Sequence, residues 1–163
     1  MNQTNITFYP FKEGAIIPTK GTATAAGYDL AACLENFITI DPGATAVIPT
    51  GLNVHIESGY ELQCRSRSGL AAKQSISVLN SPGTIDEDYT GIGPDFEIKV
   101  ILHNSSRAPF FVNPGDRVAQ LVLNQLPKTT VTVSPNEEEF LQLISSAKSD
   151  RVGGLGSTGV KSQ

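Results

Sequence analysis

Short segments in which apolar and polar residues alternate follow one another along most of this chain. Residues 51–57 are a clear case, because Leu52, Val54 and Ile56 fall on one face of an extended segment. Alternation with a period of two is typical of strands that bury one face. Similar or wholly apolar runs predict further strands at residues 6–9, 28–33, 37–40, 45–49, 60–65, 76–79, 96–102, 110–112 and 117–123. Short strands at such regular spacing favour a β-sandwich or a β-barrel.

Helical periodicity is clearest near the C-terminus. Ser134 precedes a proline and, three positions later, Glu137, which is typical of a capped helix start. We therefore predict a short amphipathic helix near residues 136–147, with Ser134 as its cap. A single helical turn capped by Ser68 is predicted at residues 68–73. The apolar residues that carry the helical spacing of the first of these helices are Phe140, Leu143, Ile144 and Ala147.

The composition supports an all-β chain and excludes several classes of function. Only 17% of the 163 residues are charged, whereas 15 are Gly and 10 are Pro, so turn formers are abundant. A net charge of −4 argues against nonspecific binding to nucleic acids or membranes, which requires a basic surface. No apolar stretch has the length of a signal peptide or a membrane span, so a cytoplasmic protein is expected.

A chain of this length is expected to form one domain around one hydrophobic core. We predict that residues 1–150 form it, including the short helix, and that residues 151–163 are a flexible Gly-rich tail that closes over a ligand. Cys33 and Cys64 lack the spacing of metal ligands and are expected to be reduced and buried. The two histidines fall in separate strands and suggest no metal cluster.

Residues 80–89 hold the densest group of candidate functional residues. Pro82-Gly83 is a tight-turn dipeptide, because Pro fixes φ and Gly accepts a positive φ, so a β-hairpin is predicted there. Asn80 precedes the turn, and Asp86 and Tyr89 follow it. A flat, ring-shaped ligand fits against such a tip and its backbone edge. An acidic surface hairpin without a ligand is the alternative that this stretch alone leaves open.

Three further segments suit an anionic ligand. Residues 65–70 combine two arginines and two serines before a possible helix N-terminus, although solvated surface is the alternative. In the tail, glycines together with Arg151, Ser157 and Thr158 suit a phosphate group, although plain disorder is equally typical of such a segment. Gln120 lies in an apolar strand, so it faces either a polar site or a sheet edge.

Five segments, in this order, resemble the motifs of the trimeric dUTP pyrophosphatase (dUTPase) family. They are Ala26-Gly27-Tyr28-Asp29-Leu30, Arg67-Ser68-Gly69-Leu70-Ala71, Gly83-Thr84-Ile85-Asp86-Glu87-Asp88-Tyr89, Gly115-Asp116-Arg117-Val118-Ala119-Gln120-Leu121 and Gly153-Gly154-Leu155-Gly156-Ser157-Thr158-Gly159. Each motif alone is weak, but five in register are specific. The resemblance implies a jelly-roll-like β-barrel or sandwich and a homotrimer whose chains share each active site. It also implies Mg²⁺-assisted hydrolysis of dUTP to dUMP and pyrophosphate.

The resemblance also implies roles for individual residues. Asp86 is the implied catalytic residue, whose ionised carboxylate takes a proton from the water that attacks the α-phosphorus. Tyr89 packs under the deoxyribose and leaves no space for a 2′-hydroxyl, and Asp29 holds Mg²⁺ through water. Further contacts with substrate are implied for Asn80, Gly83, Thr84, Ile85, Arg67, Ser68, Gly69, Gln120, Arg151, Leu155, Gly156, Ser157 and Thr158.

Two departures from the family pattern keep other functions open. Leu155 stands where the family usually has a Phe that stacks on uracil, and it lies one residue closer to Arg151 than usual. Residues 92–96 intervene between the central motif and the next strand. The alternatives are a dCTP deaminase of the same fold and a weakly catalytic, dUTPase-like module that binds a protein partner. Tyr89 and the Gly-Ser-Thr-Gly tail favour dUTP hydrolysis over deamination.

Overall fold

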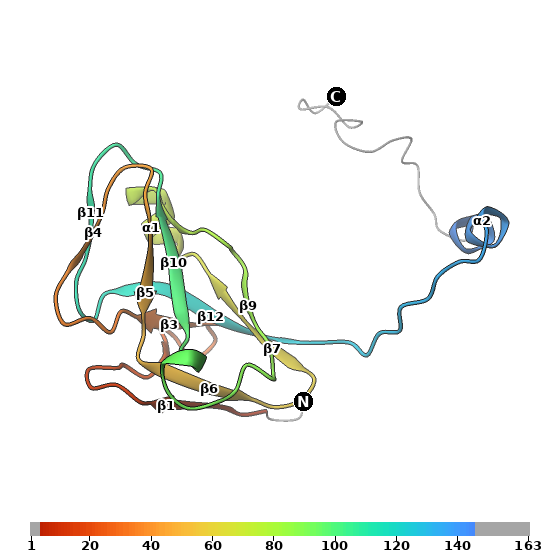
Figure 1. Cartoon of the computed structure of the whole chain (residues 1–163), viewed down its shortest axis with the longest axis horizontal. Helices are drawn as coiled ribbons and strands as arrows, with labels where there is room; N and C mark the ends of the chain where they lie inside the picture. The colour runs from red at the N-terminus through yellow and green to blue at the C-terminus, as the bar shows by residue number, and fades with distance from the viewer. Residues whose placement is uncertain (1–3, 146–163) are drawn as a thin grey trace. The chain divides into compact units, whose positions relative to one another are not determined.

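The computed structural model describes residues 4–145 of the chain (Figure 1). The chain divides into two compact units, residues 1–128 and residues 129–163. Strands dominate the described part of the first unit, whereas the second contains a helix. The predicted tail at residues 151–163 lies outside the described residues.

Twelve strands, one α-helix and one 3₁₀ helix make up the described part of the first unit. The α-helix α1 spans Ser68–Gln74 and the 3₁₀ helix η1 spans Pro94–Phe96. The strands are β1 (Ile6–Pro10), β2 (Thr19–Lys20), β3 (Gly27–Ala31), β4 (Ile38–Ile40), β5 (Thr45–Pro49), β6 (Leu52–Ile56), β7 (Tyr60–Arg65), β8 (Ile76–Val78), β9 (Gly83–Ile85), β10 (Lys99–Asn104), β11 (Phe110–Val112) and β12 (Arg117–Gln125).

The strands pair into four sheets, and every pairing is antiparallel. The largest sheet has the order β2-β3-β12-β7-β9, so β12 lies at its centre and β9 at its edge. The second has the order β5-β10-β8, and two pairs, β1-β6 and β11-β4, complete the fold. None of these sheets closes into a barrel within the described residues. The predicted all-β architecture with short helices is confirmed.

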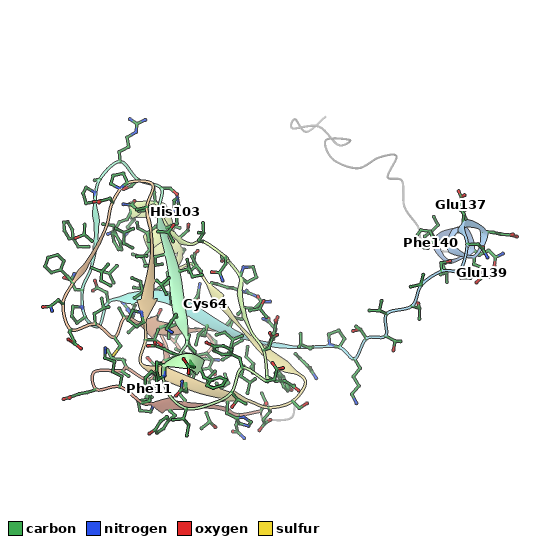
Figure 2. All side chains as sticks on the ribbon, viewed as in Figure 1. Phe11, Cys64, His103, Glu137, Glu139 and Phe140 are labelled. Carbon is green, nitrogen blue, oxygen red and sulfur yellow. The ribbon has the colours of Figure 1, made fainter. Side chains whose placement is uncertain are left out.

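Alternating side chains from these sheets fill the core of the first unit. Leu52, Val54 and Ile56 of β6 are at most 4% exposed, as their spacing predicts. Cys64 of β7 is buried among them and lies in the interior in Figure 2. Cys33 and Cys64 are both free thiols, which confirms the expectation from their spacing. The described residues contain no group of three or more His, Cys, Asp and Glu side chains that could hold a metal ion.

Four predicted details in the first unit are wrong. The segment after residue 79 does not form a simple hairpin, because β8 pairs with β10 and β9 pairs with β7, in a different sheet. Gly83 lies in β9 and does not take a positive φ. Phe96 belongs to η1 rather than to the strand that follows, and α1 begins after Arg67 with no side-chain cap, so Ser68 is its first residue rather than its cap.

The second unit contains the predicted helix near its start. Helix α2 spans Glu137–Ser145, and the predicted last two residues, 146 and 147, lie outside the described residues. The cap is Asn136 rather than Ser134, because its Oδ1 accepts a hydrogen bond from the N–H of Glu139 at 2.9 Å. The Asn136 amide also donates to the Glu139 carboxylate at 3.3 Å, which completes a reciprocal cap. None of the helices in the described residues is long and apolar enough to cross a membrane.

Candidate active site

A pocket of about 360 Å³ opens beside β9, and its lining also includes residues of strands β5 and β10 of another sheet. Its volume is in the range of pockets that bind small molecules. Lys99 adds a cation to its wall, and the apolar part of the wall consists of Val47, Cys64, Ile85, Ile98 and Ile101. Five of the predicted site residues line this pocket, namely Asn80, Gly83, Thr84, Ile85 and Tyr89.

The backbone of β9 gives this pocket a hydrogen-bonding edge. β9 pairs with β7 through Gly83, Thr84 and Ile85 and is the last strand of its sheet among the described residues. An edge strand leaves a row of N–H and C=O groups on its outer side. A flat heterocycle with donors and acceptors along one edge can bond to such a row, and main-chain groups hold these positions more rigidly than side chains do.

Asn80 and Gly83 approach each other closely at the start of β9. A Cβ atom on Gly83 would lie 3.1 Å from the Asn80 Nδ2, which is tighter than ordinary packing. Glycine is therefore required here for space, not for the positive φ that the sequence suggested. The close approach presents the Asn80 amide at the same edge as the β9 backbone.

The acidic residues after β9 differ in their partners. The Glu87 carboxylate accepts the N–H of Gly59 at 2.7 Å and the hydroxyl of Ser58 at 3.2 Å, so it fixes the turn. Asp86 is exposed, and its carboxylate has no hydrogen-bond or ion-pair partner among the described residues. Its carbonyl oxygen accepts the N–H of Tyr89 at 3.1 Å, which holds the backbone of the turn. The free carboxylate is thus placed on a fixed backbone next to the pocket.

Tyr89 closes one side of the pocket and is held from behind. Its hydroxyl donates to the carbonyl oxygen of Glu97 at 3.0 Å and lies 3.4 Å from that of Asp95. Its ring packs edge-on against Phe96, with ring centroids 6.1 Å apart. The side chain is 37% exposed, so one face of the ring remains available to a ligand.

A second group of predicted residues forms an ion cluster around Asp29. Its Oδ1 lies 3.0 Å from the Arg67 Nε, and its Oδ2 lies 2.8 Å from the Arg117 Nη1. The Arg67 guanidinium also donates to the carbonyl oxygen of Arg117 at 2.9 Å. Arg117 was not among the predicted site residues, although it stands inside one of the quoted motifs. The cluster orients Arg67 and leaves it only partly buried.

Gln120 lies beside this ion cluster in the centre of the largest sheet. It is opposite Asp29 on β3 and opposite Arg65 on β7. Its amide nitrogen donates to the carbonyl oxygen of Ser66 at 3.0 Å, and a Cβ atom on Gly27 would lie 2.3 Å from its Oε1. Gln120 therefore has the partners that a partly buried amide needs, rather than lying at a sheet edge. The remaining residues predicted for this side, Ser68 and Gly69, are exposed at the start of α1.

Five predicted residues line the pocket beside β9, whereas Arg67 alone of the second group of predicted residues lines a different hollow of the described chain. Arg67 and Arg117 line a separate cavity of about 390 Å³ near β11, and this cavity shares no lining residue with the pocket beside β9. The structure therefore brings together the residues within each group but not the two groups. The predicted tail residues Arg151, Leu155, Gly156, Ser157 and Thr158 lie outside the described residues.

The surroundings of Asp29 limit the way in which it can hold a metal ion. Both of its oxygens are engaged by arginine, and its side chain is 22% exposed. Direct coordination would bring the metal ion against two guanidinium groups of like charge. A hydrated Mg²⁺, which keeps several waters and binds chiefly to phosphates, fits beside such a carboxylate through water.

Comparison with known sequences matches most of the chain to one family. The dUTPase family model matches residues 13–159. The deoxyuridine 5′-triphosphate nucleotidohydrolase of Chlamydia trachomatis serovar L2 is 43% identical over 152 residues, which cover 93% of this chain and 97% of the relative. The enzyme of the same name from Chlamydia muridarum is also 43% identical over 152 residues.

Solved structures share the fold. The dUTPase of Staphylococcus bacteriophage 80alpha, in a mutant solved with dUpNHpp, superposes with a TM-score of 0.77 at 21% identity, covering 96% of this chain and 99% of that one. The dUTPase of Streptococcus mutans gives a TM-score of 0.68 at 26% identity, covering 77% of this chain and 98% of that one. These matches confirm the predicted dUTPase-like fold. With a family model that spans nearly the whole sequence, the chain belongs to the dUTPase family.

Proposed function

We propose that this chain hydrolyses dUTP to dUMP and pyrophosphate in an active site that three copies of the chain build together. One observation carries the proposal. A pocket of nucleoside size combines the β9 edge with an aromatic side wall, and Asp86, whose carboxylate has no partner among the described residues, directly follows Ile85 of that edge. Family membership makes dUTP the substrate that such a pocket should fit.

The β9 edge and Asn80 suit the recognition of uracil. Uracil presents an acceptor, a donor and an acceptor in a row, which match the alternating N–H and C=O groups of a strand edge. Cytosine exchanges the donor and the acceptor along this row. Each buried polar group that cytosine leaves unpaired costs about 1–3 kcal/mol, which disfavours it. Thymine carries an extra methyl group, and we expect the uracil slot beside β9 to leave no room for it.

Tyr89 supplies the contact to the sugar in this proposal. Its exposed ring face packs under the deoxyribose, and a 2′-hydroxyl on that side collides with the ring. Because the phenol hydroxyl already donates to the carbonyl oxygen of Glu97, its proton is not available to a ribose 2′-hydroxyl. The pocket therefore prefers deoxyribonucleotides.

Asp86 takes the catalytic role. Its carboxylate accepts a proton from the water that attacks the α-phosphorus, and the pyrophosphate leaves from the opposite side of that phosphorus. Glu87 next to it is engaged by Gly59 and Ser58 and serves the turn. Fixing the water and the phosphorus in line supplies much of the rate enhancement, because positioning replaces a rare collision.

The basic side of the site holds the phosphate chain. Arg67, Ser68, Gly69 and Gln120 are assigned to it, and Asp29 keeps the Arg67 guanidinium oriented. We assign Arg151, Leu155, Gly156, Ser157 and Thr158 of the tail to a lid that excludes water. Asp29 would hold Mg²⁺ through water, and a bound Mg²⁺ supplies charge neutralisation of the triphosphate.

In a homotrimer, two hollows that are separate within one chain can belong to the same active site. The pocket beside β9 of one chain and the Arg67 cluster of a second chain together would contact one nucleotide, and the tail of the third chain would cover it. A cytoplasmic location is part of the proposal, since both cysteines are free thiols, as is typical of a reducing compartment.

Pyrophosphate release from dUTP, dTTP, dCTP and UTP tests the proposed function. We expect turnover of dUTP only, and a loss of at least about a hundredfold in kcat for Asp86→Asn, as is typical when a general base is removed. Glu87→Gln is the matched control, because it changes the neighbouring carboxylate by the same chemistry. Ammonia release from dCTP, or an active Asp86→Asn variant, would overturn the proposal.

A further inference from the structure

The segment at residues 91–97, which we call the brace, lies directly behind Tyr89. We propose that Phe96 and Asn53 act through the brace as positioning residues for Tyr89, and thereby set the discrimination between deoxyribose and ribose nucleotides. This inference rests on the proposed function. Neither residue belongs to the five motifs by which the family resemblance is recognised.

The brace holds the Tyr89 side chain at its hydroxyl and along its ring. The hydroxyl donates to the carbonyl oxygen of Glu97 at 3.0 Å, and the carbonyl oxygen of Asp95 lies 3.4 Å away. The Phe96 ring meets the Tyr89 ring edge-on, at an interplanar angle of 62°. Apart from these contacts, the side chain is substantially exposed. Its orientation in the pocket therefore depends on the brace.

The position of Phe96 is itself fixed by the backbone of the brace. A Cβ atom on Gly91 would lie only 2.2 Å from the Phe96 ring, so the Gly91 backbone lies directly against that ring. The ring is thus confined by Gly91 and by Tyr89. A displacement of Phe96 would leave space into which the Tyr89 ring can move.

The brace is anchored to β6 and to the loop before it. Asn53, only 2% exposed, accepts the N–H of Gly93 at 2.8 Å and donates to the Gly93 carbonyl oxygen at 2.9 Å. Gly93 has a φ of 96°, which other residues rarely adopt. Glu97, 6% exposed, accepts the N–H groups of Thr50 at 3.2 Å and Gly51 at 2.8 Å. In Figure 1 the short green helical turn of η1 lies at the foot of β10 beside β6.

Holding Tyr89 in place in this way affects recognition of the sugar more than recognition of the base. The uracil edge is read by β9, whose pairing with β7 does not involve the brace. In the proposed function the Tyr89 ring is the part of the site that packs under the sugar, and the brace holds that ring. Because excluding a single hydroxyl depends on displacements of about 1 Å, a loosened ring admits ribose without losing the uracil contacts.

Substitution of Phe96 tests this role directly. Phe96 is 37% exposed, so Phe96→Ala should fold, and Asn53→Ala removes the anchor as a second variant. We expect the ratio of kcat/KM for dUTP over UTP to fall roughly tenfold in Phe96→Ala, chiefly through faster UTP turnover. Phe37→Ala is the matched control, because Phe37 makes the same kind of edge-on contact with Phe111, away from the pocket. It should keep the wild-type ratio.

The outcomes separate this proposal from the proposed function. An unchanged dUTP/UTP ratio in both Phe96→Ala and Asn53→Ala, with wild-type dUTP turnover intact, overturns the role of the brace alone. If the wild-type protein does not hydrolyse dUTP, the proposed function fails. Calorimetric binding of dUMP and UMP then decides, because a preference for dUMP that Phe96→Ala loses supports the brace, and absent binding or an unchanged preference overturns it.

Discussion

At the scale of single residues, the site uses neighbouring carboxylates for different purposes. Asp86 and Glu87 are adjacent in sequence and both exposed, yet of their two carboxylates only that of Glu87 has hydrogen-bond partners among the described residues. A carboxylate that accepts such hydrogen bonds is held in place, whereas one without partners is free to turn toward a ligand. The two carboxylates differ because Ser58 and Gly59, in the turn before β7, donate to Glu87. These two residues are remote in sequence from Glu87.

Cys64 lines the pocket, and the burial of its thiol makes the free energy of unfolding depend on pH. Burial raises the pKa of its thiol to about 11, from 9.0. As pH rises, the Cys64 thiol therefore ionises in the unfolded chain before it ionises in the folded chain. The buried neutral thiol contributes fully to the free energy of unfolding below about pH 9. This contribution, at most about 3 kcal/mol, is lost as pH rises towards about 11. Denaturant unfolding at pH 8 and pH 10.5 should show a steeper loss in the wild type than in Cys64→Ala. Equal slopes would contradict the burial of this thiol.

At the scale of elements, Asp29 joins three parts of the fold. It lies on β3, its partner Arg67 precedes α1, and its other partner Arg117 begins β12. These ion pairs are partly exposed, so their contribution to stability is small. Their main effect is to hold the Arg67 guanidinium in a single orientation.

Arg117→Ala should therefore reduce activity more than stability. We expect the free energy of unfolding to fall by less than about 1 kcal/mol. The KM for dUTP should rise about three- to tenfold, because Arg67 loses part of the arrangement that holds it. Lys12→Ala is the control, since it removes an exposed ion pair with Glu35 that lies outside both hollows. Steady-state kinetics and urea unfolding check both values, and an unchanged KM would contradict the orienting role.

Most strands could be predicted from sequence, but their ends and partners could not. The alternation in β6 is local, and it predicts both the strand and its buried face. The partners of β8 and β9 depend on distant strands, so the turn between them looked like a simple hairpin. The start of β10 was placed too early, because Phe96 suits a strand by propensity while Asn53 holds the neighbouring Gly93 in another conformation. Tertiary contacts override local preference in such places.

At the scale of the whole molecule, the separation of the pocket beside β9 from the cavity that Arg67 lines is visible only in the structure. The motif resemblance implied that Asp29, Arg67 and Gln120 belong to one chain's part of the site and the central segment to another chain's part, but the pattern of residues alone could not place them relative to one another. The structure joins the first three through direct contacts and leaves the pocket beside β9 apart from them. This separation supports our proposal that a second copy of the chain completes the site.

Complementation between two inactive variants tests this central claim most directly. Asp86→Asn damages the pocket side and Arg67→Ala the phosphate side, so each homotrimer alone should be nearly inactive. If each site takes these residues from different chains, trimers co-expressed from both variants in equal amounts regain both intact sides in about a quarter of their sites. Recovery of about a quarter of wild-type dUTP turnover is the predicted result. Turnover no greater than that of the separate variants, in mixed trimers verified by mass, would contradict the shared site.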